Sequence, residues 1–528
     1  MRLAPILATQ AGLLAMRAYA IPLLHSIEDL KARTTEACSA ISSTFPDQLF
    51  WPNTTQYTTE THEVWSGTCI RSPNCVFEPN TAQDLSAGLK LIKQSGSKFS
   101  VRSGGHMPVS GAQSIDDGVF ISMSKLNGRT LNADKSIASI GPGQTWIEVY
   151  EWLAQDGLAV NGGKFPSVGV GGVLIGGGIG YFSGSRGWGC DDVVGYEVVL
   201  ADGRIVQVAG GDYESSSNVT YSGSPGGEYS DLFWALKGGH NNFGIVTRYD
   251  MRTLQIGPAY GGLTVWRGAA QDQFFDALNT YMTPGNGVDD PEVVINPFAS
   301  IVPANGSSSY QVVNVAMYPG TNPNPPALEP FANIDSSLIA SSQVGVHDSW
   351  TAIPRIFESV AGQQTRHLFW AVSFKGDPRA FSIHNRTVVD GALAELGHVE
   401  GLRIITTWQP ISRGWLEISK QAGGNVIDLD PETDGTFVAG RIESFWNNAE
   451  DDDAVYSFSE RAAQEIDAAT QRLGLHNPFI YLNEASGSQK PFESLGGGRS
   501  LPKLRRIQAK YDPDGFLKNS LQHGFSLD

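Results

Sequence analysis

Arg102-Ser103-Gly104-Gly105-His106 is the stretch of this sequence that decides the fold, and it follows a predicted strand at residues 98–101. Adjacent glycines disfavour a helix, because each costs roughly 1 kcal/mol there relative to alanine. They let backbone N–H groups turn toward an anion, as in phosphate sites, and Arg102 would add planar charged donors. A glycine turn with an incidental surface histidine is the competing interpretation. A second glycine-rich loop further along favours a phosphate-binding turn that holds His106 near the ligand.

That second loop is Val168-Gly169-Val170-Gly171-Gly172-Val173-Leu174-Ile175-Gly176-Gly177-Gly178-Ile179-Gly180. A Rossmann dinucleotide turn needs a buried strand before the glycines and a long helix after them. Residues 161–167 are polar, and residues 181–187 are not expected to be helical, so a Rossmann turn is disfavoured. The glycines instead favour backbone lying along a flat or phosphorylated ligand. Tight packing of two backbones is the alternative.

Size and charge restrict the class of protein. The 528 residues predict two or three domains, and the 41% apolar content is ample for their cores. A net charge of −17 argues against nucleic acid and against anionic membrane surfaces as partners. No segment reaches the ~20 apolar residues that span a bilayer. An acidic enzyme or small-molecule binding protein is expected.

The N-terminus predicts export. Met1-Arg2, an apolar stretch over residues 3–16 and Ala18-Tyr19-Ala20 form a signal-peptide pattern over residues 1–20. A secreted protein beginning near Ile21 is therefore expected. Sequons for N-glycosylation agree with export, although such triplets also arise by chance; they begin at Asn53, Asn218, Asn305 and Asn385.

The four cysteines are few enough to discuss singly. An oxidising compartment permits disulfides, and one bridge is expected among Cys38, Cys69 and Cys75. Cys190 is expected to be a buried free thiol. Since neither CxxC nor HExxH occurs, no metal site is predicted.

Local patterns predict alternating helices and strands up to about residue 253. Thr81-x-x-Asp84 and Thr145-x-x-Glu148 each begin a helix. Asp202-Gly203 predicts a hairpin over residues 196–208.

Beyond Pro258 the pattern changes. Strands at 262–266, 311–317 and 369–374 alternate with helices and Pro-rich loops, which predicts a largely antiparallel sheet. Asp451-Asp452-Asp453 is expected to be a solvated loop. The C-terminal elements expected are a helix from Ser457 to Gly474, a strand over 479–483 and a helix over 500–511.

Taken in order, these features resemble the FAD-linked oxidases of the vanillyl-alcohol oxidase superfamily, within it the secreted berberine-bridge-enzyme-like group. The resemblance covers essentially the whole mature chain. Besides the two glycine loops, it rests on Gly238-Gly239-His240-Asn241-Asn242-Phe243-Gly244-Ile245-Val246-Thr247, on Tyr481-Leu482-Asn483 and on Tyr511-Asp512-Pro513-Asp514-Gly515-Phe516.

The resemblance implies an α+β chain with a two-domain PCMH-type FAD-binding fold. Its substrate domain would be built on a largely antiparallel sheet covered by helices. The expected boundaries are 21–256 for the FAD-binding domain, 257–474 for the substrate-binding domain and 475–528 for a C-terminal segment that returns to the first domain.

The resemblance also implies that His106 bonds covalently to the flavin 8α-methyl group. A covalent bond prevents cofactor loss in a dilute medium, and the substituent raises the flavin potential. Loop 102–106 would cradle the pyrophosphate, and residues 168–180 would run beside the ribityl chain and ring. The residues expected to bind FAD are His106, Arg102, Ser103, Gly104, Gly105, Val168, Gly169, Gly171, Gly172, Gly176, Gly177, Gly244, Ile245 and Val246.

Three positions refine this expectation. Many relatives carry a second covalent link through a cysteine where Phe165 stands, so a single attachment is expected here. Loss of that cysteine shifts the expected substrate from an oligosaccharide toward a small aromatic or polyketide-like metabolite. Val173 replaces a histidine of many plant members. Val168 is implied at the flavin face that meets O₂, where a small valine is associated with oxidases; simple packing against the ring is the alternative.

For the catalytic base the resemblance points to Tyr481, with Asn483 orienting the ring or substrate. A phenol has a pKa of about 10, so a cation or hydrogen-bond donor must lower it. Glu484 and Glu443 are alternative bases, and His367 is a weaker one. A purely structural role is the alternative for each.

The resulting hypothesis is a secreted, monomeric FAD-dependent oxidase. It would transfer hydride from a small alcohol, phenolic or secondary metabolite to covalently bound flavin, and then to O₂ to give H₂O₂. Three alternatives stay open: an oxidative cyclase or isomerase of a biosynthetic pathway, a carbohydrate oxidase, and a binding protein without turnover.

Overall fold

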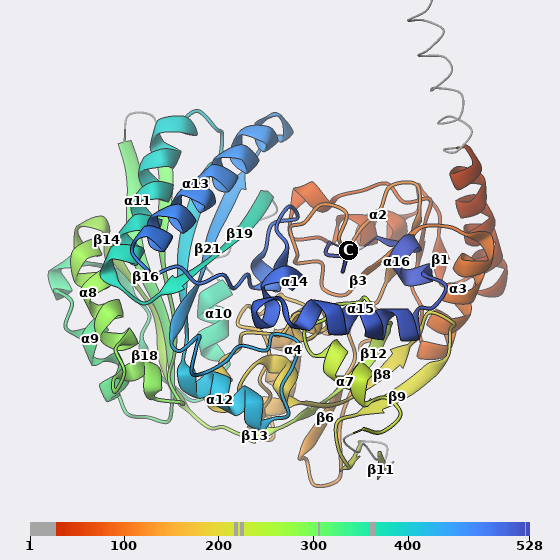
Figure 1. Cartoon of the computed structure of the whole chain (residues 1–528), viewed down its shortest axis with the longest axis horizontal. Coiled ribbons are helices and arrows are strands. Elements are labelled where there is room, and N and C mark those ends of the chain that lie inside the picture. Colours follow the sequence, from red (N-terminus) through yellow and green to blue (C-terminus); the bar gives the residue numbers. More distant parts are fainter. Residues whose placement is uncertain (1–27, 216–219, 222–225, 305–306, 359–364, 523) are drawn as a thin grey trace, which may run out of the picture.

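The computed structural model describes residues 28–215, 220–221, 226–304, 307–358, 365–522 and 524–528. These residues form two halves that lie side by side (Figure 1). One half holds two five-stranded sheets, and the other holds one eight-stranded sheet. The predicted α+β class is confirmed. The expected signal peptide and the sequons at Asn218 and Asn305 lie outside the described residues.

The first sheet contains the strand that leads into the first glycine loop. Its order is β1-β2-β4-β3-β22, and β2, β4, β3 and β22 run parallel to one another. The strands are β1 (Leu49–Phe50), β2 (Cys75–Phe77), β4 (Val119–Ser122), β3 (Phe99–Arg102) and β22 (Leu521–Gln522). Helix α3 (Ala82–Ser95) links β2 to β3 and begins with the predicted Thr81–Asp84 capping box. The C-terminal strand β22 thus returns to the sheet that presents the first loop.

The second sheet is antiparallel and has the order β5-β6-β12-β8-β9. Its strands are β5 (Arg129–Leu131), β6 (Ile137–Ile140), β12 (Ile245–Arg252), β8 (Val193–Val199) and β9 (Ile205–Ala209). Strands β8 and β9 form the predicted hairpin, with Gly203 at φ 79°. Helix α4 (Trp146–Ala154) begins with the predicted Thr145–Glu148 box.

The third sheet is antiparallel throughout, as predicted, and has eight strands. They are β14 (Ala259–Arg267), β15 (Val294–Ala304), β16 (Ser307–Pro319), β17 (Ile339–Ser342), β18 (Gly345–His347), β19 (Arg366–Lys375), β20 (Arg403–Ile411) and β21 (Phe437–Trp446). Helices on its outer face are α8 (Gln271–Met282), α11 (Pro378–Glu395) and α13 (Asp452–Arg472). Helices α10 (Ala352–Glu358) and α12 (Arg413–Gln421) belong to the side that meets the first half.

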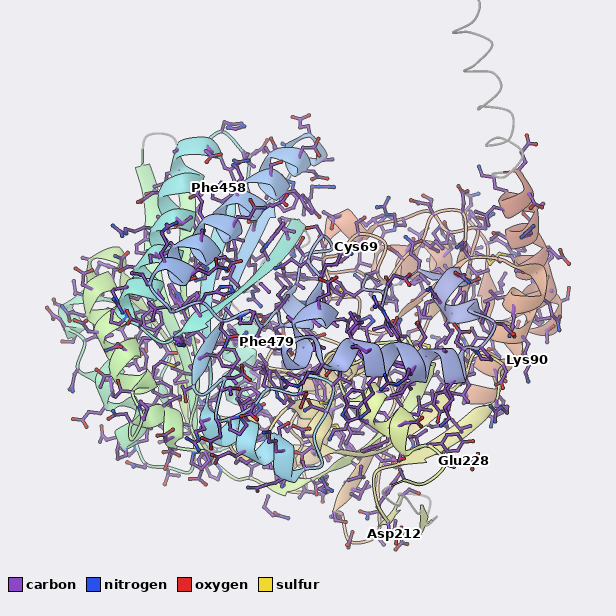
Figure 2. All side chains as sticks on the ribbon, in the orientation of Figure 1. Cys69, Lys90, Asp212, Glu228, Phe458 and Phe479 are labelled. Atoms are coloured by element: carbon purple, nitrogen blue, oxygen red, sulfur yellow. A yellow bond between two sulfur atoms is a disulfide. The ribbon has the colours of Figure 1, made fainter. Side chains whose placement is uncertain are left out.

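Alternate side chains of this sheet enter two different cores, because successive residues of a strand point to opposite faces. In β21, Val438 and Ile442 pack under the outer helices with Phe458 of α13, which is labelled in Figure 2. The intervening positions of β21 face the first half, whose core they share. Arg441 and Glu443 fall on this inner face. The sheet therefore places charged groups between the two halves.

Two predicted segments differ from the structure. The aspartate run is not a solvated loop, because α13 begins at Asp452 rather than near Ser457. Carboxylates stabilise the N-terminus of a helix. The Asp452 carboxylate also accepts hydrogen bonds from Arg366 Nε (2.5 Å) and Trp446 Nε1 (2.8 Å).

Residues 479–483 form no strand, and Leu482–Glu484 is a single 3₁₀ turn. The Phe479 and Ile480 N–H groups donate to the side chains of Asn477 (3.0 Å) and Ser494 (3.0 Å), so they do not join a sheet ladder. The expectation that residues 181–187 lack helix is also wrong, since Ser183–Arg186 is a one-turn helix. The helix Ser500–Tyr511 (α15) is confirmed.

The cysteines behave as predicted. Cys38 and Cys75 form a disulfide that ties the helix over residues 28–44 to β2. Cys69 and Cys190 are buried free thiols. The sequon at Asn385 cannot serve as a glycosylation site in this fold, because Asn385 is 2% exposed and donates to Gln271. None of the helices in the described part of the chain is long and apolar enough to cross a bilayer.

Candidate active site

A cavity of about 220 Å³ lies where the two halves meet. From the first half it receives residues 101–107, much of 163–175 and part of 240–246. From the third sheet it receives side chains of β15, β19, β20 and β21, and the 3₁₀ turn near residue 484 closes it. Segments far apart in the sequence thus share one wall.

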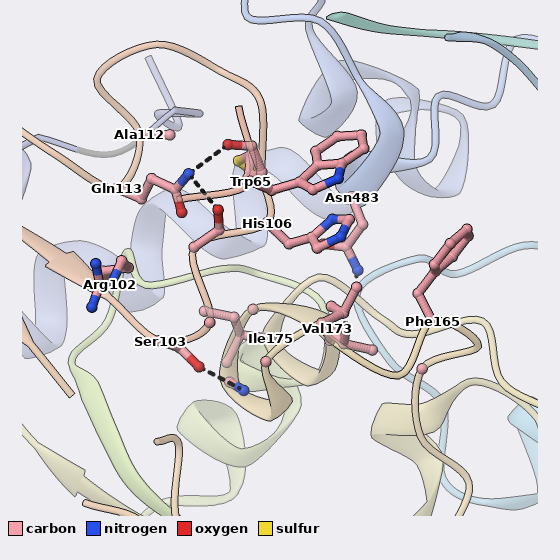
Figure 3. A pocket seen from close by; sticks show the side chains of 18 of the residues that line it. Trp65, Arg102, Ser103, His106, Ala112, Gln113, Phe165, Val173, Ile175 and Asn483 are labelled. Atoms are coloured by element: carbon pink, nitrogen blue, oxygen red, sulfur yellow. Dashed lines mark hydrogen bonds between the residues drawn. The ribbon is translucent and has the colours of Figure 1, made fainter. Parts of the chain in front are cut away.

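The two glycine loops touch each other in this wall. A methyl group on Gly104 would overlap the backbone of Gly169, and one on Gly169 would overlap Gly104. Ser103 Oγ accepts a hydrogen bond from the Gly171 N–H (3.2 Å), drawn as the dashed line at Ser103 in Figure 3. The same hydroxyl donates to Pro142 O (2.5 Å). Both sequence interpretations of the second loop therefore hold, because its glycines pack against a backbone and line the cavity.

The cavity wall beside the second loop is open. A methyl group on Gly172 would meet no atom within 4 Å, although Gly172 lines the cavity. Because Gly172 has no side chain, a flat cofactor such as FAD could lie directly against the backbone at this point of the cavity. The residues present thus fit the cofactor that the sequence implies.

Nearly all predicted FAD-binding residues line the cavity, including Gly244, Ile245 and Val246. Gly176 and Gly177 do not. A methyl group on Gly176 would overlap the Asn483 side chain, so this glycine admits Asn483 rather than a ligand.

Arg102 lines the cavity, and its guanidinium also has partners in the surrounding scaffold. Its guanidinium pairs with the buried Glu60 carboxylate and donates to Glu63 O (2.9 Å). Its side chain is 2% exposed. Because a buried carboxylate already balances this charge, Arg102 holds the loop in place, and an anion in the cavity would be met by backbone N–H groups.

His106 lies at the centre of the site. Its ring stacks on Trp65, with ring centroids 4.2 Å apart and planes at 12° (Figure 3). Gln113 Nε2 donates to the carbonyls on either side, Gly105 O (2.9 Å) and Met107 O (2.8 Å), and so fixes the backbone. Burial, with a smaller contribution from the Arg441 charge, lowers the pKa of His106 to about 3. The imidazole is therefore neutral at physiological pH and keeps a nucleophilic lone pair.

Phe165 stands in the place of the cysteine of many relatives, and its ring centroid lies 6.2 Å from that of His106. It packs against Phe357 at 4.2 Å. Phe369 lies 5.2 Å from Trp65 between ring centroids. All four aromatic side chains line the cavity. The wall around His106 is therefore largely aromatic.

Tyr481 and Asn483 meet the second loop. The Tyr481 hydroxyl accepts from the Ile179 N–H (3.1 Å) and from Asn483 Nδ2 (3.1 Å). Asn483 Nδ2 also donates to Val173 O (3.1 Å). Burial, and secondarily the Glu484 charge, raises the pKa of Tyr481 above its ordinary value. The phenol is thus protonated near neutral pH, contrary to the condition that a base requires.

Glu484 belongs to a buried network that faces the cavity. Arg441 donates to Glu484 (2.6 Å) and to Glu443 (2.6 Å). Gln409 Nε2 donates to both oxygens of Glu484 (2.8 and 2.9 Å). Glu484 is therefore held by charged and neutral donors together, whereas the Glu443 carboxylate accepts from Arg441. Burial raises the pKa of Glu443, and the charge of Arg441 opposes this.

His367 lies outside the cavity wall. It is fully buried, and its Nε2 is 2.7 Å from Thr365 Oγ1. Its ring lies edge-to-face with that of Trp65, with ring centroids 3.7 Å apart. The structure thus places it behind the site as a support for Trp65.

Several lining residues escaped the sequence interpretation. They are Trp65, Gln113, Lys164, Asn296, Gln409 and Arg441. The period-two pattern of β21 could have placed Arg441 on the same face as Glu443. Nothing in the sequence could have shown that β21 faces the glycine loops.

Comparisons with known proteins agree with this geometry. The model of a family described as an FAD binding domain matches residues 73–209. The "FAD-dependent monooxygenase prx3" of Penicillium roqueforti is 33% identical over 511 residues, which cover 95% of each chain. The "Bifunctional solanapyrone synthase" of Alternaria solani is 30% identical and covers 93% of this chain and 89% of its own.

Among solved structures, glucooligosaccharide oxidase from Acremonium strictum superimposes with a TM-score of 0.70 at 18% identity, covering 91% of this chain and 97% of that one. This likeness shows a shared fold. The fold is also that of a berberine-bridge-enzyme-like protein of Physcomitrella patens, which superimposes with a TM-score of 0.69 at 16% identity and covers 91% of this chain and 97% of that one. Because relatives at 33% and 30% identity cover nearly the whole chain, the protein belongs to the same family as these fungal FAD-dependent enzymes and is an FAD-dependent oxidoreductase.

Proposed function

We propose that this protein is an oxidase that converts a C–OH group of a small aromatic or polyketide-like metabolite to a carbonyl, with O₂ reduced to H₂O₂. When bound, FAD supplies the two-electron acceptor that O₂ reoxidises. The observation that carries the proposal is the neutral His106, held between the glycine loops and a cavity wall of aromatic and carboxylate side chains.

His106 is the proposed covalent attachment point. Attachment needs an unprotonated ring nitrogen, and the lowered pKa of His106 provides one at any physiological pH. Glucooligosaccharide oxidase carries a 6-S-cysteinyl, 8α-N1-histidyl FAD. Since Phe165 replaces the expected cysteine, we propose the histidyl link alone. The predicted FAD-binding backbone, including Gly104, Gly105, Val168, Gly169, Gly171 and Gly172, would line the cofactor.

Proton removal from the substrate C–OH is assigned to Glu443. Its carboxylate faces the cavity, and burial raises its pKa toward the range useful for a base. The Tyr481 oxygen accepts hydrogen bonds from the Ile179 N–H and from Asn483 Nδ2, so its O–H can donate to the substrate oxygen. Asn483 orients that hydroxyl, and Glu484 orients Arg441. Tyr481 as the base is the competing assignment.

The aromatic wall favours a flat, apolar substrate over an oligosaccharide. Trp65, Phe165, Phe357 and Phe369 offer ring faces and few hydrogen-bond partners for sugar hydroxyls. An oxidative cyclase is a second candidate, because the Alternaria solani relative carries the name of a synthase. Both reactions consume one O₂ per product, so the structure of the product separates them: an oxidase releases the carbonyl compound, whereas an oxidative cyclase releases a ring-closed product.

We also propose that the protein is secreted. The support is the N-terminal signal-peptide pattern and the Cys38–Cys75 disulfide. Division of the chain at residues 256 and 474 into FAD-binding and substrate-binding domains stays a prediction, and so does the monomeric state.

The test begins with the purified protein. Acid precipitation should leave yellow flavin on the polypeptide. Oxygen uptake across a panel of aromatic alcohols, phenolic metabolites and oligosaccharides should be largest for the aromatic compounds, with H₂O₂ formed in equal amount. Release of all flavin into the acid supernatant would contradict the histidyl link. Turnover without oxygen uptake would contradict the oxidase assignment.

A further inference from the structure

Lys164 is a buried cation on the cavity wall that the proposed chemistry does not use. It is 9% exposed and lies in the turn that also carries Phe165. Removing an ammonium group from water is costly unless it gains strong partners. Its surroundings therefore indicate what it is built to meet.

The hydrogen bonds of Lys164 are long. Its Nζ lies 3.4 Å from Ile295 O, 3.5 Å from Asn296 Oδ1 and 3.5 Å from Gln409 Oε1. All three are neutral oxygens at the outer limit of hydrogen-bond length. Among the described residues, no carboxylate oxygen lies within 4.0 Å of Lys164 Nζ, the limit for a salt bridge. An ammonium group has three donors, and each of these has only a long contact with a neutral oxygen.

The neighbouring carboxylates are already engaged. Gln409 and Arg441 hold Glu484, and Arg441 holds Glu443. Gln409 directs its Nε2 at Glu484, which turns its oxygen toward Lys164. The arrangement holds Lys164 at the wall without neutralising it at close range.

The charge of Lys164 is therefore not balanced at close range by a described residue. The Glu484 carboxylate acts on it from beyond the length of a salt bridge, and that carboxylate is paired with Arg441 at 2.6 Å. An anionic group in the cavity would give Lys164 a charged partner in direct contact.

We propose that Lys164 binds an anionic oxygen of the substrate, so that the protein acts on aromatic metabolites that carry an acidic group such as a carboxylate, phenolate or enolate. The aromatic side chains Trp65 and Phe165 contact the ring, and Lys164 sets its orientation toward Glu443. This inference rests on the proposed function insofar as the same cavity is the substrate site.

The test compares benzoate with benzamide, which has nearly the same shape and no charge. Each is titrated into the purified holoprotein by calorimetry, and the shift of the visible flavin absorption is recorded in parallel. Benzoate should bind roughly tenfold or more tightly than benzamide, because a hydrogen bond to a charged partner exceeds a neutral one by that amount.

Three variants separate charge from packing. Lys164→Met keeps the aliphatic stem and should remove the preference for benzoate, with benzamide affinity unchanged. Lys164→Arg should keep the preference. Lys135→Met is the control, because Lys135 is an exposed partner of Asp156 in the same half. Unchanged benzoate affinity in folded Lys164→Met would overturn the proposal.

The unmodified protein offers a second test that needs no variant. Burial lowers the pKa of Lys164 to about 8, with the Arg441 charge adding to this and the Glu484 charge opposing it. Benzoate affinity should therefore be constant below pH 8 and fall as pH rises through it, while benzamide affinity stays level. Of the other lining groups, the pKa of His106 lies near 3, those of Tyr481 and Glu443 are raised, and Arg441 and Glu484 form an ion pair.

Each outcome decides. A level benzoate affinity from pH 7 to pH 9 would overturn the proposal, and so would failure of benzoate to bind. Flavin content, measured separately after acid precipitation, reports on the proposed function. A colourless protein that still prefers benzoate by calorimetry would reject the flavoenzyme proposal and keep the Lys164 site.

Discussion

The two walls of the cavity are built in different ways. The wall from the first half is backbone, with loops 102–106 and 168–172 packed against each other through Gly104 and Gly169. The wall from the eight-stranded sheet is made of side chains from three strands, with Asn296 on β15, Gln409 on β20, and Arg441 and Glu443 on β21. A backbone wall tolerates almost no substitution, whereas a side-chain wall can change specificity without disturbing the fold.

The largest effect should follow from filling the contact between the loops. Gly104→Val would place a side chain against the Gly169 backbone, and overpacking of this kind costs about 1–3 kcal/mol or more. We expect a lowered melting temperature and no bound flavin. Gly211→Ala is the control, because a methyl group there meets nothing within 4 Å. Normal flavin content in Gly104→Val would show that the two loops do not form a rigid wall.

His106→Ala should abolish covalent flavin while leaving the fold intact, because the ring packs on Trp65 without supporting the sheet. The measurement is acid-stable flavin absorbance on the precipitated protein. His398→Ala, at an exposed position, should retain it. Acid-stable flavin in His106→Ala would place the attachment elsewhere.

Glu443→Gln tests the side-chain wall. It keeps the shape and removes the proposed base, so the rate of substrate oxidation should fall by about 10²–10⁴ with flavin content unchanged. The control is Glu450→Gln at an exposed position, which should leave the rate of substrate oxidation unchanged. If Tyr481→Phe loses as much rate as Glu443→Gln and removes the acidic limb of the pH profile, Tyr481 is the base instead.

Glu60→Gln tests the assignment of Arg102 to the scaffold. It leaves the buried guanidinium with only the exposed Glu63 as a charged partner, at 3.3 Å, and loss of a buried partner costs up to about 3–5 kcal/mol. The melting temperature should fall, while the folded fraction keeps its flavin. Exposed Glu36→Gln is the control. Unchanged stability with weakened flavin binding would return Arg102 to the role of a phosphate ligand.

The smallest effect is expected at Val168, which lines the cavity and is half-buried. Val168→Ile should slow reoxidation by O₂ less than tenfold, because one methylene narrows the approach to the flavin without closing it. Stopped-flow mixing of the reduced protein with oxygenated buffer measures this. Exposed Val302→Ile should react like the unmodified protein. A faster reaction in Val168→Ile would contradict this placement.

The sequence was sufficient for features in which one local segment carries its own explanation. Capping boxes placed α3 and α4, Asp202-Gly203 placed the β8–β9 hairpin, and the glycine loops placed most of the cofactor side. The prediction from sequence failed where a residue distant in the sequence determines the local structure. The aspartates at 451–453 lead into α13, and Asp452 finds Arg366 from a distant strand. The predicted strand at 479–483 does not form, because the N–H groups of Phe479 and Ile480 donate to side chains rather than to a neighbouring strand.

By itself, then, the sequence determined the cofactor and the class of fold, and it predicted the covalent anchor, because those depend on contiguous motifs and on local backbone preference. Only the tertiary structure decided that Arg102 is neutralised, that Tyr481 stays protonated and that Lys164 and Arg441 face the same cavity as His106. These outcomes depend on burial and on charges brought together from distant segments. A side chain's protonation and partners are set by its surroundings, which no local pattern contains.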